Sequence, residues 1–277
     1  MAEPLVLLVD NGSLAAAPTL RLREVAAALA KKIGRPVAPV SLLHSSGVPA
    51  RELGGVPAEI LVPALTRRLA AGDDDFLVVP LFFGLGAALT DFLPDCVAQL
   101  RAKVPRLTVR LAPPLFEPRD DRLALILADQ VRAAAADFGG PPPRRVALVD
   151  HGSPVRAVTA VRDQLAEQLG AALGADYIVT PASMERREGA EYDFAGPLLG
   201  SVLRQPGWSS GEVIVAMQFL LPGRHAGPGG DVERICREAE TSGAGLRTRA
   251  TALVGEHPLL VDILADRWRT GAASTPI

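Results

Sequence analysis

Cysteine is scarce in this sequence: its 277 residues include two cysteines, Cys96 and Cys236, which are far apart and form no CxxC pair. This argues against a disulfide scaffold, a zinc site of four thiolates and a cysteine-bound iron–sulfur cluster. An excess of charge of one sign is also lacking, since 29 Lys and Arg residues stand against 31 Asp and Glu residues. That balance gives no electrostatic basis for nucleic acid or anionic lipid as the main partner.

Long apolar runs and targeting signals are lacking too. Apolar runs such as Val213–Met217 fall well short of the roughly 20 residues that a membrane-spanning helix needs. The first residues, MAEPLVLLVDNGS, show neither the basic region nor the cleavage pattern of a signal peptide. We therefore expect a soluble, cytoplasmic protein without a membrane partner.

Nucleotide-binding motifs are absent from the sequence. No GxxxxGK[ST] or GxGxxG follows an expected strand, so a nucleotide cofactor has little support. The segment DHGSP, residues 150–154, also lacks the GxSxG elbow of the α/β hydrolases.

What the sequence does contain is an internal repeat. LVLLVDNGS at Leu5–Ser13 matches RVALVDHGS at Arg145–Ser153, an offset of 140 residues. ILADQVR at Ile126–Arg132 matches ILADRWR at Ile263–Arg269, an offset of 137 residues. With 277 residues in all, the chain consists of two similar halves that arose by duplication.

The boundary between the halves is predicted at FGGPPPRR, residues 138–145. Three successive prolines remove amide donors and fix φ, so neither a helix nor a strand is expected to continue through this segment. The sequence thus predicts an N-terminal domain at 1–137 and a C-terminal domain at 146–277.

Each half alternates short apolar segments with amphipathic ones, which indicates strands and helices of a parallel α/β fold. Strands are expected at Pro4–Asp10, Val37–Leu43, Asp75–Phe83, Leu107–Ala112, Arg145–Asp150, Tyr177–Pro181, Glu212–Leu221 and Leu246–Thr251. Helices are expected at Arg21–Lys32, Cys96–Lys103, Val158–Ala172 and Val232–Glu240. The prediction is two flavodoxin-like or Rossmann-like domains, with ligands bound beyond the carboxyl ends of the strands.

Polar residues follow three expected strands of the second half: Asp150–Ser153, Met184–Glu188 and Gly223–His225. In a parallel sheet these segments converge on one edge. Two imidazoles with one or two carboxylates suit a divalent metal, or proton transfer near neutral pH. The alternative is that each histidine bonds its own turn.

Comparison of the halves favours a shared role for the histidines. The repeat places Asn11 opposite His151 and Ala88 opposite His225. Both histidines are thus present in one half and both are missing from the other. Joint presence and joint absence indicate one common task.

VDHGS after the first strand of the second half, and LLPGRH about 75 residues later, resemble the class II chelatases. More narrowly, nearly the whole chain resembles the long, two-repeat form of the sirohydrochlorin cobaltochelatase/ferrochelatase family. The resemblance implies ATP-independent insertion of cobalt(II) or iron(II) into sirohydrochlorin or a related tetrapyrrole, in cobalamin or sirohaem biosynthesis. It also implies that the metal is a substrate rather than a bound cofactor.

The family's two active-site histidines correspond here to His151 and His225. Long members commonly carry this pair in the first half, whereas this chain has it in the second. We expect both histidines to act as metal ligands and proton acceptors. Glu185 is expected to complete the metal site or relay protons; Glu188 is a rival, and a solvated loop carboxylate is the alternative.

Cationic side chains beside these residues are expected to bind the carboxylates of the tetrapyrrole. The candidates are Arg224, Arg186 and Arg187, with Arg156 weaker, and Ser153 is assigned to substrate binding as well. Two other functions stay open. One is a carrier that binds metal or tetrapyrrole without catalysis, and the other is a hydrolase that uses Ser153. A monomer with pseudo-dimeric halves is expected, and cobalt, iron and nickel are not distinguished.

Overall fold

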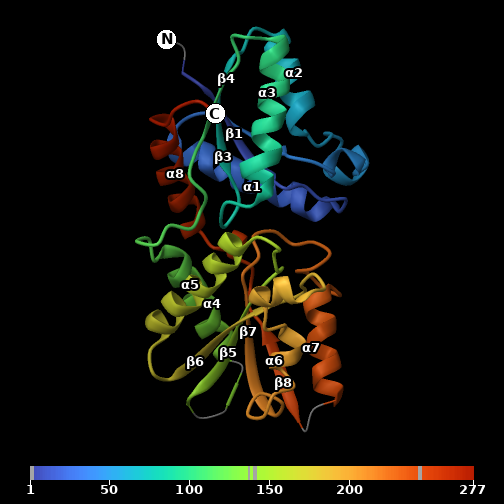
Figure 1. Cartoon of the computed structure of the whole chain (residues 1–277), viewed down its shortest axis with the longest axis vertical. Coiled ribbons are helices and arrows are strands. Elements are labelled where there is room, and N and C mark those ends of the chain that lie inside the picture. The colour runs from blue at the N-terminus through green and yellow to red at the C-terminus, as the bar shows by residue number, and fades with distance from the viewer. Residues whose placement is uncertain (1–2, 137, 140–141, 243–244) are drawn as a thin grey trace. The chain divides into compact units, whose positions relative to one another are not determined.

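The computed structural model of the chain describes residues 3–136, 138–139, 142–242 and 245–277. These residues form two compact units (Figure 1). Unit 1 comprises Met1–Leu115 and Pro258–Ile277, and unit 2 comprises Phe116–His257. None of the helices in the described ranges is long and apolar enough to cross a membrane.

Unit 1 contains a parallel sheet with the strand order β2-β1-β3-β4. Its strands are β1 (Leu5–Asp10), β2 (Val37–Ser41), β3 (Asp75–Pro80) and β4 (Thr108–Leu111). Its helices are α1 (Ala16–Ile33), α2 (Leu61–Ala70), α3 (Leu93–Lys103) and α8 (Leu259–Ala272). Short helical turns lie at Ser45–Gly47, Ala50–Leu53 and Ala88–Phe92, the last of them a π-helix.

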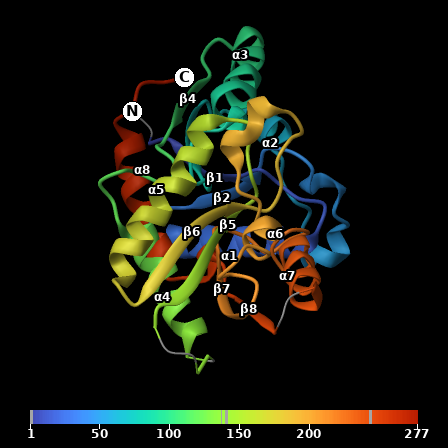
Figure 2. The same cartoon turned by 60° about the horizontal axis from the view of Figure 1, so that its bottom comes forward.

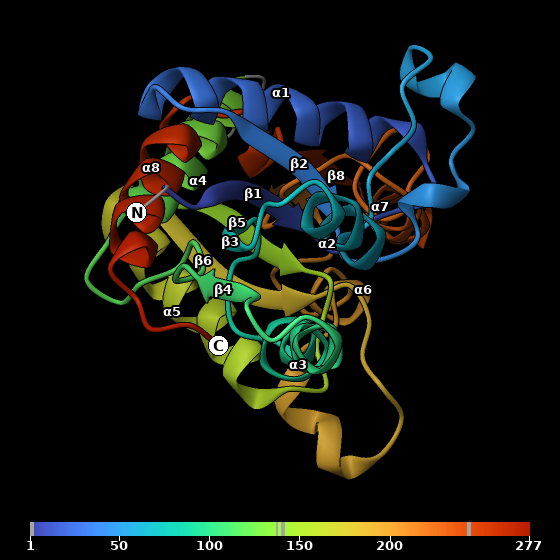
Figure 3. The same cartoon turned by 90° about the horizontal axis from the view of Figure 1, so that it is seen from above.

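Helices cover both faces of this sheet, so its central strands are apolar throughout. Leu7 and Val9 of β1 point into a buried cluster with α2 and α3. Val6 and Leu8 alternate with them and are also buried, and α1 and α8 pack against the sheet (Figure 3). A run of apolar residues without alternation is what a strand buried on both faces requires.

Unit 2 repeats this architecture with the strand order β6-β5-β7-β8 (Figure 2). Its strands are β5 (Arg144–Asp150), β6 (Tyr177–Ser183), β7 (Gly211–Met217) and β8 (Leu246–Ala250). Its helices are α4 (Arg122–Ala135), α5 (Arg156–Leu173), α6 (Leu199–Val202) and α7 (Asp231–Ser242). 3-10 turns lie at Ala190–Ala195 and Val254–Glu256.

The predicted α/β fold with two similar parallel-sheet domains is confirmed. Each of the expected strands and helices is present, with ends that differ from the expected ones by a few residues, except that α1 begins five residues before Arg21. Both sheets have the flavodoxin-like strand order 2-1-3-4. The second strand is added on one side of the first strand and the third strand on the other side, so the switch point lies between the first and third strands. Ligands of such sheets bind at the carboxyl ends of the strands beside this switch point.

The compact units do not coincide with the predicted domains at 1–137 and 146–277. Helix α4 lies in unit 2 and packs on α5 and β7, whereas α8 lies in unit 1 and packs on α1 and β3. Figure 1 shows this exchange by colour: the red α8 lies among the blue and cyan elements of unit 1. The predicted linker at 138–145 also ends earlier than expected, because β5 begins at Arg144; residues 140 and 141 of that segment lie outside the described residues.

Buried contacts explain why the last helix belongs to unit 1. Arg267 of α8 is 4% exposed. Its guanidinium donates to the carbonyls of Pro114 and Leu115, at 2.9 and 2.7 Å. The repeat in the sequence records which segments were duplicated, but it carries no information on which sheet each final helix covers.

Candidate functional site

His151 and His225 lie side by side in unit 2. His151 follows β5 directly and His225 lies in the loop after β7, and these two strands are neighbours in the sheet. The ring centroids are 4.6 Å apart with an interplanar angle of 81°, an edge-to-face arrangement. The two imidazoles therefore meet beside the switch point, where the fold places ligands.

Glu185 joins this pair from the third strand end, after β6. Its Oε1 lies 3.6 Å from Nε2 of His151, and its amide donates to the carbonyl of His151 at 3.1 Å. Gly152 permits this approach because its φ is +95° and a Cβ there would lie 1.9 Å from the Glu185 carbonyl oxygen. The local backbone thus brings the carboxylate and the imidazole together.

The hydrogen bonds of His151 indicate its tautomer. Nδ1 lies 3.1 Å from the carbonyl oxygen of Gly152, and a carbonyl accepts, so Nδ1 carries the hydrogen in the neutral ring. Nε2 then presents a lone pair toward the Glu185 carboxylate. Two acceptors that face each other in this way favour a cation between them, either a proton or a metal ion.

The spacing of these two acceptors fits a metal ion. Ligand atoms about 2.1 Å from one ion are about 3.4 Å apart at the tetrahedral angle, close to the 3.6 Å between Nε2 of His151 and Oε1 of Glu185. The side chains of His151 and Glu185 are 48% and 62% exposed. A hydrated ion can therefore reach both without passing through the protein.

Asp231, the first residue of α7, orients the second histidine. Its Oδ2 lies 2.7 Å from Nδ1 of His225, and because a carboxylate accepts, Nδ1 carries the hydrogen and Nε2 is left with its lone pair. The hydrogen bond from His225 holds the pKa of Asp231 below its usual range. Sequence reasoning missed Asp231, although an acidic residue six positions after His225 at a helix start was a usable signal.

The described residues contain no group of three or more His, Cys, Asp or Glu side chains arranged to hold a metal ion. His151 contacts both Glu185 and His225, so these three side chains are neighbours that an incoming ion would have to draw together, not a preformed three-ligand site. Such a set is suited to an ion that arrives and leaves.

The two predicted arginines on the loop after β6 are engaged within that loop. Arg186 forms an ion pair with Asp193, and the Arg187 guanidinium lies 5.8 Å from the ring centroid of Tyr192. Arg186 would have to leave Asp193 in order to bind a ligand carboxylate.

The other two arginine candidates differ in availability. Arg224 is next to His225, has 85% of its side chain exposed, and lies 3.8 Å from Asp231 through Nε. Arg156 lies over the ring of Phe194, with 4.2 Å between the guanidinium carbon and the ring centroid. Of the four predicted arginines, Arg224 combines high exposure with a position beside a site histidine.

Ser153 has a role in its own turn. Its hydroxyl accepts the amide of Val155 at 3.1 Å. Ser13 accepts the amide of Ala15 at the same distance in unit 1. A bond that recurs in the half without the histidine pair serves the turn before the helix.

A buried polar network lies beneath the site. Asp150, 7% exposed, precedes His151, and its Oδ1 accepts the hydroxyl of Ser183 at 2.8 Å. Burial raises the pKa of Asp150, while the Ser183 hydrogen bond and the Arg162 guanidinium act in the opposite direction. Sequence reasoning missed Arg162 because it lies in a helix, in a segment with no motif.

The same edge of unit 1 has lost all three site side chains. The pairings Val9–Pro80 and Val149–Met217 show that the sheets share one register. Asn11 therefore occupies the position of His151. The repeat places Ala88 opposite His225, but Ala88 begins the helical turn Ala88–Phe92, whereas His225 lies in the loop before α7. Leu43 occupies the position of Glu185, since its amide donates to the Asn11 carbonyl at 3.2 Å.

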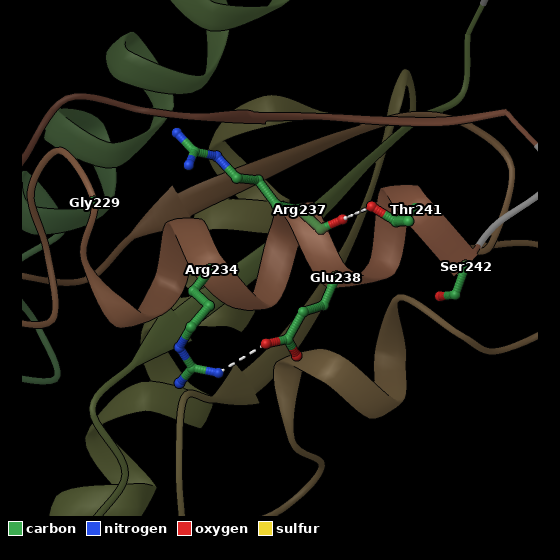
Figure 4. A pocket seen from close by; sticks show the side chains of 6 residues that line it. All are labelled: Gly229, Arg234, Arg237, Glu238, Thr241 and Ser242. Carbon is green, nitrogen blue, oxygen red and sulfur yellow. Dashed lines mark hydrogen bonds and ion pairs between the residues drawn. The ribbon is translucent and has the colours of Figure 1, made fainter.

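Two cavities of unit 2 lie near this region. One, of about 310 Å³, is lined by His225 together with Glu233, Thr251 and mainly apolar residues. A larger one, of about 630 Å³, runs along α7 and contains none of the site residues (Figure 4). Arg234 and Glu238, which line it, bond each other at 2.9 Å, so their charges offset one another.

No protein-family model and no curated sequence matches the chain. Solved structures do match it over almost its full length. SirB from Bacillus subtilis with Fe³⁺ has a TM-score of 0.72 at 15% identity, over 98% of this chain and 96% of that one. The sirohydrochlorin chelatase SirB from Bacillus subtilis subspecies spizizenii with cobalt has a TM-score of 0.67 at 16% identity, with the same coverages.

CbiX, described as the terminal enzyme for the biosynthesis of sirohaem in denitrifying bacteria, has a TM-score of 0.61 at 21% identity. The match covers 98% of this chain and all of that one. The chain therefore has the fold of the class II chelatases, as its resemblance to them predicts. More particularly, it is similar in fold to the sirohydrochlorin chelatases SirB and CbiX.

Proposed function

We propose that this protein is a class II chelatase that inserts cobalt(II) or iron(II) into sirohydrochlorin or a related tetrapyrrole without ATP. The observation that carries the proposal is the edge-to-face pair of His151 and His225, with Glu185 beside it, at the switch point of a chelatase fold. The solved neighbours that bind iron or cobalt support these two metals. We place the reaction in cobalamin or sirohaem biosynthesis in the cytoplasm; Cys96 and Cys236, both buried free thiols, are compatible with a reducing compartment.

Metal binding falls to the two Nε2 atoms and the Glu185 carboxylate. Each histidine uses Nδ1 for a bond to the protein, so both Nε2 lone pairs are available to the incoming ion. Imidazole is a good ligand for divalent first-row ions, and a set of three ligands leaves positions for water and then for ring nitrogens.

Proton removal falls to the same groups. A tetrapyrrole must lose two protons when the metal enters, and a neutral imidazole accepts a proton near pH 7. Asp231 stabilises the imidazolium of His225 through its 2.7 Å hydrogen bond. Glu185 stabilises that of His151 from 3.6 Å, so each base has its own carboxylate.

Recognition of the ring carboxylates is assigned to Arg224 first, because it is exposed beside His225. Arg186 and Arg187, on the loop after β6, follow in this role, and Ser153 completes the proposed set. Each guanidinium can form a paired hydrogen bond with a carboxylate.

The test is anaerobic metal insertion into sirohydrochlorin, followed through the absorbance of the ring. We expect multiple turnovers in the wild type, with the rate reduced at least about 100-fold in His151→Ala and in His225→Ala. His44→Ala in unit 1 is the matched control and should retain the wild-type rate. Insertion that stops at one equivalent indicates the carrier function instead, and wild-type rates in both site variants contradict the assignment.

A further inference from the structure

The side chain of Arg162 is fully enclosed in unit 2, with 1% exposed. Its Nη1 donates to the Ser183 hydroxyl at 2.6 Å and to the Ala195 carbonyl at 2.8 Å. Its Nη2 donates to the Gly196 carbonyl at 3.0 Å, and Nε and Nη2 both contact Oδ1 of Asp163, at 2.9 and 2.7 Å. These five hydrogen bonds are all to groups of unit 2, and Nη1 also lies 4.0 Å from Oδ1 of Asp150.

These contacts join three parts of the candidate site. Ser183, at the end of β6, donates its hydroxyl hydrogen to Asp150, which precedes His151. Ala195 and Gly196 form the far end of the loop that starts at Glu185. The guanidinium therefore connects the turn that bears His151 to the end of the loop that bears Glu185.

The loop from Glu185 to Gly196 is fixed at its two ends and is largely exposed between them. At the first end, the Glu185 amide donates to the His151 carbonyl at 3.1 Å. At the second end, Arg162 holds both the Ala195 and Gly196 carbonyls. Ser183 of β6 also holds this end, through its hydroxyl to the Ala195 carbonyl at 2.7 Å and its amide to the Pro197 carbonyl at 2.8 Å. Loss of Arg162 therefore removes the bond to Gly196 and one of two bonds to Ala195, which loosens this end of the loop without releasing it.

The fold itself does not require this arginine. Unit 1 has the same aspartate and serine, Asp10 and Ser41, but Leu22 takes the helix position of Arg162. There the carbonyl of Pro57, the counterpart of Ala195, is held instead by Arg23, at 3.2 Å in an exposed contact. The buried guanidinium occurs in the half that has the histidine pair and is replaced by leucine in the half that lacks it.

We infer that Arg162 is a positioning residue of the metal site, which fixes the Glu185 loop against His151 without touching the metal. The inference rests on the proposed function, because the metal site is the one proposed there. Cobalt(II) binding can nevertheless be measured separately from the insertion reaction. Removing groups that orient metal ligands typically weakens metal binding by 10- to 100-fold. We expect a loss of this size when the guanidinium is removed.

The experiment compares Arg162→Leu, which copies Leu22, with the wild type by titration with cobalt(II). Binding is followed through the visible absorption of the ion, which reports the number and geometry of its ligands. Arg162→Leu is expected to weaken binding 10- to 100-fold and to change the spectrum, while kcat for insertion falls and KM for the tetrapyrrole stays the same. Arg162→Lys, which retains a donor for Ser183, should recover part of the affinity and keeps the test valid if the leucine variant does not fold.

Arg267→Leu is the matched control, since Arg267 is also a buried arginine that donates to two backbone carbonyls, but in unit 1. It should lower the melting temperature and leave the cobalt(II) spectrum unchanged. Equal cobalt(II) affinity in Arg162→Leu and the wild type overturns the inference alone. A wild type that neither binds cobalt(II) nor inserts it overturns both this inference and the proposed function.

Discussion

Replacing Gly152 by alanine tests the contact that brings His151 and Glu185 together. The new Cβ would lie 1.9 Å from the Glu185 carbonyl oxygen, where at least about 3.0 Å is needed. The two segments must therefore separate by roughly 1 Å. The φ of +95° adds about 1–2 kcal/mol of strain for a residue with a side chain, and the lost hydrogen bond from the Glu185 amide adds about 1 kcal/mol.

We therefore expect Gly152→Ala to lower the free energy of unfolding by about 2–3 kcal/mol, measured by urea denaturation. Cobalt(II) binding should weaken as well, because Glu185 moves away from His151. Gly12→Ala is the matched control, since a Cβ there would lie 1.8 Å from the Leu43 carbonyl oxygen in unit 1. It should cost similar stability and leave cobalt(II) binding intact. Unchanged stability in Gly152→Ala, or equal losses of binding in both variants, would refute the reasoning.

Three further predictions concern single features of the two units. Asp231→Asn removes the charge beside its histidine and should lower the insertion rate by about 10-fold or more at unchanged melting temperature; an unchanged rate contradicts this role. Burial raises the pKa of Asp10 to about 6, above its unfolded value, so the contribution of Asp10 to stability should be fully present below about pH 4 and be lost as the pH rises through about 6, a change of about 3 kcal/mol. Asp10→Asn should flatten that decline, seen in urea unfolding at pH 4, 6 and 8, and an equally pH-dependent variant excludes Asp10 as its source. The triple variant Asn11→His, Leu43→Glu, Ala88→His should bind one additional equivalent of cobalt(II) by titration. If no additional equivalent binds, the two sheet edges are not equivalent.

Much of the fold could be predicted from sequence because buried parallel strands consist of consecutive apolar residues. Val146–Asp150 and Val213–Met217 stand out in this way, and the turn after each is marked by polar residues. The repeat also placed Asn11 opposite His151, which the register of the two sheets bears out. These are local or periodic signals, which a single sequence contains.

Contacts that depend on the path of a loop or on distant segments could not be predicted in this way. The acidic residue at the start of α7 was a usable signal, but its bond to His225 depends on how the loop before α7 turns back. Arg162 looks like an ordinary polar position of an amphipathic helix, and the carbonyls that it binds lie more than thirty residues away. The packing of α8 on unit 1 could not be predicted either, because an apolar helix face does not specify which sheet it covers.

The division of the chain has a consequence for its synthesis. Unit 2 is one uninterrupted segment, Phe116–His257, whereas unit 1 is assembled from Met1–Leu115 and Pro258–Ile277. A ribosome that adds 5–20 residues per second needs roughly 10–30 s between Leu115 and the end of α8. During that interval β3 lacks the helix that covers it, so the apolar side of the first sheet is open to chaperones, whereas all residues of unit 2 are synthesised before α8 begins. The half of the protein that begins first is thus the half that is finished last.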